Sequence, residues 1–134
     1  MNFPKLIPIF PLSNFIMFPN TTVPLNIFEP RYIDMINDSM KSEKFIGMIQ
    51  PKSFQDTKNI IPDLYKIGCL GKITSFKETE SSTFLIELKG VIRFSIINEI
   101  KSDKKYRLCE VDYNDYETDI DEHKENIKFS DLEL

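Results

Sequence analysis

Residues 6–28 read LIPIFPLSNFIMFPNTTVPLNIF, a run of 23 residues without a charged side chain. A run of this length could cross a bilayer as a helix, but prolines interrupt it at positions 8, 11, 19 and 24. A proline in a helix interior removes a backbone donor and costs about 3 kcal/mol, and the hydrocarbon core offers no replacement hydrogen bonds. Lys5 is the single basic residue before the run, and no small-residue cleavage site accompanies it, so the features of a secretion signal are missing. We therefore expect neither a membrane span nor a secretion signal, and we predict a cytoplasmic protein.

The prolines divide the run into two short apolar segments, residues 6–10 and 23–28, which are predicted strands. Because proline is tolerated at the edge of a sheet, Pro8 and Pro24 are expected to mark edge positions. Residues 11–19 form a predicted loop, and this loop contains the four consecutive apolar side chains Phe15, Ile16, Met17 and Phe18. Two roles are open for these four residues. They either cover the end of the fold as a hydrophobic plug, or form an exposed surface that binds extended hydrophobic polypeptide.

The segment after this run has the features of a helix over about residues 30–41. Pro30 suits the first helical position, where its missing N–H has no partner to lose, and Glu29 complements the positive end of the helix dipole. Apolar residues at helical spacing predict one buried stripe, made of Tyr32, Ile33, Ile36 and Met40, with Tyr32 and Met35 at its flanks.

The strongest β signal lies in residues 83–97, TFLIELKGVIRFSII. Its apolar side chains occupy even positions on both sides of Gly90, namely Phe84, Ile86, Leu88, Ile92, Phe94 and Ile96. This pattern predicts one long strand with a single buried face, bent at Gly90, as a small and highly curved barrel requires. Further strands are predicted at residues 45–50, 66–76 and 106–113, with Cys109 and Val111 pointing inward. The order of two strands, one helix and at least four strands indicates a mainly β (α+β) fold.

The negative charge is concentrated at the C-terminal end. Residues 114–134 contain eight acidic side chains and two lysines, a net charge of −6, whereas residues 1–113 contain fifteen basic and thirteen acidic side chains, a net charge of +2. We therefore predict a folded domain over residues 1–113 and an acidic, solvated connector over residues 114–134. Residues 130–133 match the S-x-x-E capping box, so a helical segment, cut short, is expected to begin at Ser130. A nearly neutral domain lacks the basic footprint of a nucleic-acid binder.

No catalytic or metal-binding constellation is found in the sequence. Residues 68–74 (GCLGKIT) depart from a phosphate-binding loop, because Ile73 stands where Ser or Thr would bind magnesium. His123 is the single histidine and lies in the acidic tail. Cys69 and Cys109 fit no metal spacing, and packed thiols are favoured over a disulfide. We predict a protein without enzymatic activity, metal or cofactor.

Three basic features are interpreted structurally. Residues 101–107 (KSDKKYR) form a predicted hairpin turn rather than a phosphate contact. Arg93 is on the outward parity of its strand and is expected to pair with Glu87 or another carboxylate. Arg31 is expected to tie the start of the helix to a neighbouring strand. Such exposed pairs contribute little stability, and a lone arginine defines no ligand.

Three stretches of the chain occur in an order that is found in a known family. They are residues 7–40, which contain EPRY at positions 29–32, then the strand IGCLGKI at 67–73, and then the G-x-x-R-F element at 90–94 within LKGVIRFSI. In these stretches, across residues 6–97, the chain resembles the amino-terminal domain of Lon proteases. Asn20 stands where the family usually has a glycine after the loop proline, and Cys69 where threonine is common. No ATPase module and no serine–lysine protease domain accompanies these elements in this chain.

The resemblance implies a six-stranded pseudo-barrel of the PUA-like kind with one main helix. It also implies a non-catalytic module that binds unfolded or tagged polypeptide in the context of ATP-dependent Lon-type proteolysis, and that helps to order the assembly, so self-association is open. Two alternatives remain, a stand-alone LON-domain adaptor and a PUA-like RNA-binding module, the latter by analogy of fold only. The expected partner is unfolded or hydrophobic polypeptide, with no nucleic acid and no membrane, and the candidate binding residues are Phe15, Ile16, Met17 and Phe18.

Overall fold

The structure is a computed structural model that describes residues 2–13, 15–52 and 63–120. Over these residues the chain forms six strands, one main helix and a short 3-10 turn. In chain order the elements are β1 (Leu6–Pro11), β2 (Thr22–Ile27), α1 (Pro30–Met40), β3 (Phe45–Ile49), β4 (Ile67–Glu78), β5 (Phe84–Ile100), β6 (Arg107–Asp112) and η1 (Asn114–Tyr116). The predicted order of two strands, one helix and four strands is confirmed.

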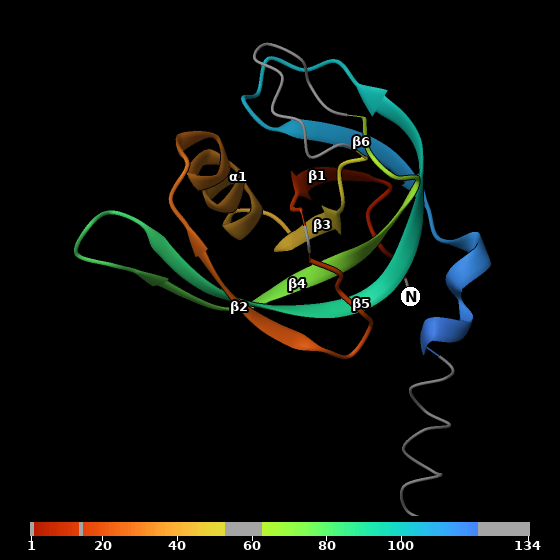
Figure 1. Ribbon diagram of the computed structural model, residues 1–134, viewed down its shortest axis with the longest axis horizontal. Helices are drawn as coiled ribbons and strands as arrows, with labels where there is room; N and C mark the ends of the chain where they lie inside the picture. The colour runs from red at the N-terminus through yellow and green to blue at the C-terminus, as the bar shows by residue number, and fades with distance from the viewer. Residues whose placement is uncertain (1, 14, 53–62, 121–134) are drawn as a thin grey trace, which may run out of the picture.

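The six strands form one sheet in the order β2-β5-β4-β3-β1-β6, and an additional pairing between β5 and β6 closes it (Figure 1). Closure depends on the length of β5, whose first half pairs with β2 over Phe84–Lys89 and whose second half pairs with β6 over Ser95–Ile100. A long strand that serves two sides of a closed sheet must bend. The register of β4 against β5 shifts where Gly71 faces Gly90, so the prediction of a pseudo-barrel with a bend near Gly90 is confirmed.

Two hydrophobic cores result from this bend. The helix-side core contains the residues of α1 that face the sheet together with Phe84, Ile86 and Leu88 from the first half of β5. The barrel core contains Ile92 and Phe94 from the second half. The even-position pattern of β5 is therefore confirmed, and its single buried face serves both cores in turn.

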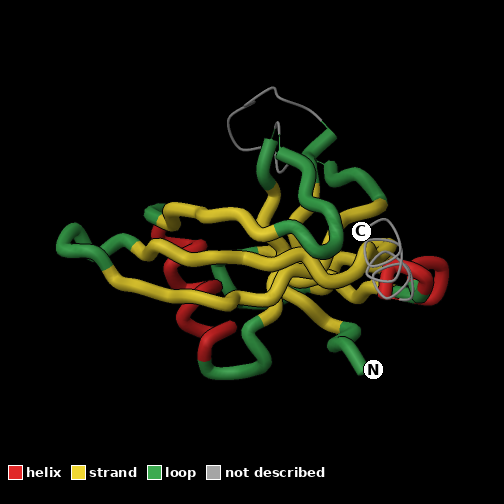
Figure 2. The backbone as a smooth tube through the Cα atoms, turned by 90° about the horizontal axis from the view of Figure 1, so that it is seen from below, coloured by secondary structure: helices red, strands yellow, loops and turns green. Residues whose placement is uncertain are grey.

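The helix begins at Pro30 with Glu29 at its N-cap, as predicted. Its buried residues are Tyr32, Met35, Ile36 and Ser39. The stripe is centred on Met35, which is fully buried, whereas Ile33 and Met40 are only partly buried. The prediction that Met35 lies at the flank is wrong, because α1 is rotated to place Ser39 as well as its apolar residues against the sheet. Figure 2 shows α1 and the short helical segment that follows β6 at opposite ends of the long strands.

The basic turn between β5 and β6 packs against α1. The Tyr106 hydroxyl donates to the Asp38 carboxylate at 2.6 Å, and the Lys104 ammonium lies 3.2 Å from the same carboxylate. Lys105 approaches Asp34 at 4.0 Å. The structural interpretation of residues 101–107 is confirmed, since this turn holds the helix on the sheet.

The two prolines predicted at edge positions have different surroundings. Pro24 lies in β2, which pairs with β5 alone and is an edge strand. Pro8 lies in β1, between β3 and β6, so the prediction of an edge position is wrong. Proline is tolerated there because Pro8 faces Leu108 of β6, while the pairing with β3 begins only at Ile9.

The first residues of the acidic segment pack against the barrel. Residues 118–120 are helical, Asp119 is only 3% exposed, and Ile120 contacts the barrel core. The solvated character expected of this segment therefore does not apply to Asp119, because its carboxylate has partners on β5. The division after residue 113 stays a prediction, and Ser130 and His123 lie outside the described residues.

Candidate functional site

The loop between β1 and β2 contains the predicted binding residues, and backbone hydrogen bonds fix it at both ends. At its start the Leu12 N–H donates to the carbonyl of Ile49 at 3.0 Å, and the Gln50 side-chain amide donates to the carbonyl of Phe15 at 3.1 Å. At its end Asn20 and Thr21 exchange hydrogen bonds with Gly90, each at 2.8 Å. The loop is thus tied to β3 on one side and to β5 on the other.

The turn at the end of this loop explains the departure at position 20. Asn20 has a φ of 68°, in the left-handed region that favours glycine and that asparagine tolerates better than most residues. The Thr21 hydroxyl donates to the Phe18 carbonyl at 2.7 Å and completes the turn. Asparagine can therefore occupy the position where the resembling family usually has glycine.

Gly90 is the point at which this loop contacts β5. A Cβ atom on Gly90 would lie 2.1 Å from the carbonyl oxygen of Phe18 and 3.2 Å from the side chain of Met17. The first of these distances is shorter than any non-bonded contact allows, so the loop backbone can lie there only because residue 90 has no side chain. The sequence pattern predicts the bend at Gly90 but not this close approach.

The four predicted binding residues divide into a buried and an exposed pair. Met17 is 6% exposed and belongs to the helix-side core, and Phe15 is partly buried against the same core. Ile16 and Phe18 are 64% and 60% exposed. Met17 therefore covers the core, as the plug role predicts, whereas Ile16 and Phe18 face outward; the binding of polypeptide by this loop stays a prediction.

All four residues line one apolar groove of about 450 Å³. The end of β3, the start of β4 and the segment before β4 also line this groove, through residues that include Met48, Ile49, Gln50, Tyr65, Ile67 and Cys69. Tyr65 and Ile67 are about half exposed, and Ile16 and Phe18 somewhat more. Two other hollows of the described surface, of about 360 and 550 Å³, are lined by more charged and polar side chains. We take the apolar groove as the candidate functional site.

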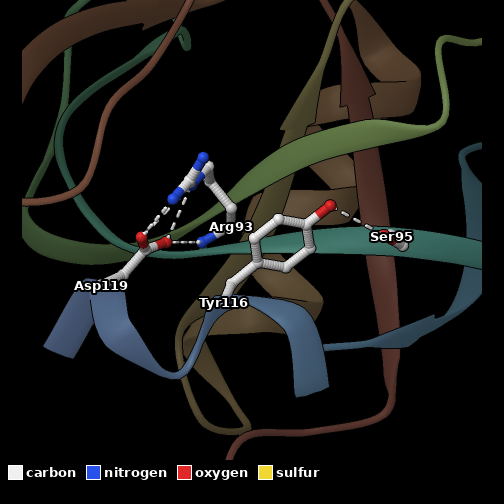
Figure 3. A network of polar contacts seen from close by, with 4 residues as sticks. All are labelled: Arg93, Ser95, Tyr116 and Asp119. Carbon is white, nitrogen blue, oxygen red and sulfur yellow. Dashed lines mark hydrogen bonds and ion pairs between the residues drawn. The ribbon is translucent and has the colours of Figure 1, made fainter. Parts of the chain in front are cut away.

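Arg93 lines one part of the groove and is bound to Asp119 (Figure 3). Its guanidinium donates to both carboxylate oxygens, with distances of 2.7 Å from Nη2 to Oδ1 and 3.1 Å from Nε to Oδ2, and its backbone N–H donates to Oδ2 at 2.9 Å. The guanidinium also lies 5.0 Å from the centre of the Tyr116 ring, and the Tyr116 hydroxyl is 3.0 Å from Ser95 Oγ. The predicted carboxylate partner of Arg93 is confirmed, and it is Asp119 rather than Glu87.

The buried position of Asp119 affects its ionisation. Burial alone would raise the pKa of its carboxyl group, but the hydrogen bonds from Arg93 and the guanidinium charge outweigh this effect and lower the pKa.

Arg31 pairs at 3.1 Å with Glu29, two residues before it, and its guanidinium lies over the Tyr32 ring. The prediction that Arg31 reaches a neighbouring strand is therefore wrong, because its side chain stays on its own segment.

Neither of the two cysteines is an activated nucleophile; Cys69 lines the groove and Cys109 lies outside its lining. Cys69 is 2% exposed and Cys109 is fully buried, and both are free thiols, as predicted. Burial raises the pKa of Cys69 to about 12 and that of Cys109 to about 11. Thiols with such pKa values are protonated at neutral pH and act as apolar packing groups. Within the described residues, no three His, Cys, Asp or Glu side chains gather in a way that could hold a metal ion.

Comparison with known proteins identifies the family. Residues 6–132 match the ATP-dependent protease La (LON) substrate-binding domain. The chain belongs to this family. It is 32% identical over 101 residues to the Lon protease of Desulfosudis oleivorans, a match that covers 75% of this chain and 12% of that protein. It is 25% identical over 109 residues to Lon protease 2 of Myxococcus xanthus, covering 81% of this chain and 13% of that protein. The LON domain thus spans about an eighth of these relatives.

Solved structures show the same fold. A Lon N-terminal domain protein from Xanthomonas campestris matches with a TM-score of 0.65 at 24% identity, over 82% of this chain and 60% of that one. The N-terminal domain of the Mycobacterium avium complex Lon protease matches with a TM-score of 0.60 at 16% identity, over 81% and 54% of the two chains. The fold predicted for the LON domain is confirmed by these matches.

In this LON domain two of the three sequence elements that carry the family resemblance contribute to the groove. Ile67, Gly68 and Cys69 of the IGCLGKI strand line it, whereas residues 29–32 (EPRY) form the start of α1 and lie outside its lining. Gly90 and Arg93, both from the G-x-x-R-F element, hold the apolar loop and Asp119 respectively. Tyr65 and Ile67 were missed as groove residues by sequence reasoning, because their presence in the same groove as Ile16 and Phe18 depends on the long-range pairing of β3 with β4. No helix of the described residues is long and apolar enough to span a membrane.

Proposed function

We propose that this LON domain binds unfolded or hydrophobic polypeptide segments in the apolar groove. It does so as a non-catalytic recognition module, either within a Lon-type ATP-dependent protease or as a stand-alone LON-domain adaptor. The observation that supports the proposal is the exposure of Ile16 and Phe18, 64% and 60%, on a loop whose neighbour Met17 is buried. Large apolar side chains gathered around a concave surface are typical of sites that bind protein segments.

The construction of the loop favours binding over collapse. Hydrogen bonds to Ile49, Gln50 and Gly90 hold its backbone in place, so little further ordering is needed when a segment enters the groove. The lining includes Met17, Met48 and Cys69, whose polarizable side chains adapt to different apolar partners. A groove of this kind suits substrates that share apolar character rather than one sequence.

The experiment measures binding of a fluorescent, unstructured apolar peptide to the wild-type domain and to Ile16→Asp and Phe18→Asp. Burying a large apolar side chain contributes about 1.5–3 kcal/mol, so each variant is expected to bind about tenfold more weakly or worse. Both side chains are exposed in the free domain, and thermal unfolding is expected to be nearly unchanged. Gel filtration of the same samples shows whether self-association accompanies binding.

The matched control is Phe28→Asp. Phe28 is 65% exposed, as much as the two loop residues, but it lies between β2 and α1 and does not line the groove. Its substitution introduces the same charge and removes similar apolar surface, and we expect unchanged affinity. Equal losses in all three variants, or no loss in the two loop variants, would place binding outside the groove.

A further inference from the structure

The charged side chains around the groove are of one sign. Among the described residues that line it, Lys66 and Arg93 are cationic and none is anionic. The body of the chain, in contrast, has nearly equal numbers of basic and acidic side chains. No carboxylate among the described lining residues offsets these two cations within the groove, whereas Asp63 and Glu99 line the neighbouring hollow of about 360 Å³ that Lys66 also borders.

Arg93 and Lys66 differ in how their charge is balanced. The Arg93 guanidinium is bound to the Asp119 carboxylate, whose side chain is 2% exposed. Lys66 is exposed, and among the described residues no ion pair within 4.0 Å includes its ammonium group. The positive charge available to a bound segment is thus that of Lys66.

The backbone places Lys66 at the apolar wall of the groove. It lies between Tyr65 and Ile67, which both line the groove and are about half exposed. The Lys66 carbonyl accepts a hydrogen bond from the Ile96 N–H at 2.8 Å, and the Tyr65 N–H donates to Gln50 at 3.0 Å. These bonds fix the base of a long side chain whose ammonium group can reach residues that flank a bound apolar segment.

We propose that the groove selects apolar segments that carry a carboxylate directly beside the apolar residues, and that Lys66 binds this carboxylate. The inference rests on the proposed function, since it names the class of polypeptide that the groove prefers. The Lys66 ammonium group attracts a carboxylate on the segment and repels an ammonium group at the same place. Both effects contribute to the discrimination between segments. The carboxylate can belong to an acidic side chain or to the C-terminus of the segment.

The experiment compares four fluorescent peptides with one apolar stretch in common. Three are amidated at the C-terminus and end in Asp-Asp, Ser-Ser or Lys-Lys, and the fourth ends in Ser-Ser with a free carboxylate. We expect wild-type affinity to decrease in the order Asp-Asp, Ser-Ser, Lys-Lys, by about two- to fivefold at each step. Tighter binding of the free Ser-Ser peptide than of its amide assigns the C-terminus as a further source of the carboxylate, and equal binding restricts the preference to acidic side chains. These differences are expected to shrink as the salt concentration increases.

The protein variants separate Lys66 from net charge. Lys66→Gln is expected to abolish the preference, and Lys66→Glu to reverse the order of the Asp-Asp and Lys-Lys peptides. The matched control is Lys77→Glu, which changes the net charge equally near the far end of β4, roughly 35 Å away along the strand. Lys77 is exposed and does not line the groove, so the wild-type order should persist in this variant.

The outcomes distinguish the two proposals. If the amidated peptides bind wild type equally, while Ile16→Asp and Phe18→Asp still weaken all of them, the charge preference is overturned and the groove remains the binding site. If Lys77→Glu acts like Lys66→Glu, the preference arises from net charge and the role of Lys66 is overturned. If no peptide binds the wild-type domain, the proposed function itself is overturned.

Discussion

The carboxylate of Asp119 accepts hydrogen bonds from both the guanidinium and the backbone N–H of Arg93, a residue 26 positions earlier in the chain. The contact joins the segment after β6 to the second half of β5. Arg93 also lines the apolar groove. One ion pair therefore connects the groove to the segment that leads toward the C-terminus.

Asp119→Asn tests the contribution of this pair to stability. Removing a charged hydrogen-bond partner is expected to lower the free energy of unfolding at pH 7 by roughly 1.5–3 kcal/mol. The pKa of Asp119 is lowered in the folded state, so its stabilising effect is complete above the unfolded pKa, near 4, and is lost as the pH falls through the lower folded pKa. Urea denaturation between pH 7 and pH 2 should show a loss of stability on acidification that is smaller in the variant.

Asp115→Asn is the control for this measurement. Asp115 is an exposed carboxylate in the same segment, and its substitution changes the net charge by the same amount. We expect its stability curve to follow that of the wild type. Parallel curves for wild type and Asp119→Asn would show that the Arg93 contact adds no pH-dependent stability.

Gly90→Ala tests the close approach between β5 and the apolar loop. The added Cβ would lie 2.1 Å from the Phe18 carbonyl oxygen, so the loop must move away from β5. We expect a loss of about 1–3 kcal/mol in unfolding free energy, together with weaker binding of apolar peptide, because Ile16 and Phe18 move with the loop.

Gly71→Ala separates these two effects. Its added Cβ would meet the side chain of Leu88 at 2.6 Å, in the core and outside the groove. A comparable loss of stability is expected, measured by urea denaturation, with peptide affinity retained at temperatures where the domain is folded. Equal effects of the two substitutions on affinity would contradict a specific role of Gly90 in holding the loop.

Ser39→Ala is expected to stabilise the domain. Ser39 is buried on the sheet side of α1, and its hydroxyl has no hydrogen-bond partner among the residues that the structure describes. Replacement by alanine removes a buried polar atom and improves helix propensity, so the unfolding free energy should rise by about 0.5–1 kcal/mol. Ser42→Ala is the control, because the Ser42 hydroxyl donates to the Ser39 carbonyl at 3.2 Å and its loss should not stabilise. A decrease in the melting temperature of Ser39→Ala would indicate that the hydroxyl has a partner.

Tyr106→Phe tests how the basic turn holds α1. The Tyr106 hydroxyl donates to Asp38 at 2.6 Å, and this bond is the main cause of the lowered pKa of Asp38. Without the hydroxyl we expect a loss of about 1 kcal/mol in stability and a rise in the Asp38 pKa, measured by NMR titration. Tyr65→Phe, which alters an exposed tyrosine outside this contact, should change neither quantity. An unchanged Asp38 pKa in Tyr106→Phe would assign the shift to Lys104 and Lys41 instead.

The sequence by itself determined the local elements of this protein. Prolines in residues 6–28 exclude a helix because they remove backbone donors, Pro30 suits a helix start, and the even-position pattern of residues 84–96 requires a strand with one buried face. These properties depend on neighbouring residues, so a short stretch of sequence is enough to predict them. The family followed from the same local motifs, and so did the four residues of the apolar loop.

Only the tertiary structure decided which of these elements meet. It closes the sheet through β5 and β6, buries Met17 while Ile16 and Phe18 stay exposed, and brings Tyr65 and Ile67 into the same groove. It also selects Asp119 as the partner of Arg93. Contacts between distant residues depend on strand register and on the packing of side chains from separate elements, and neither is encoded in the periodicity of any single segment.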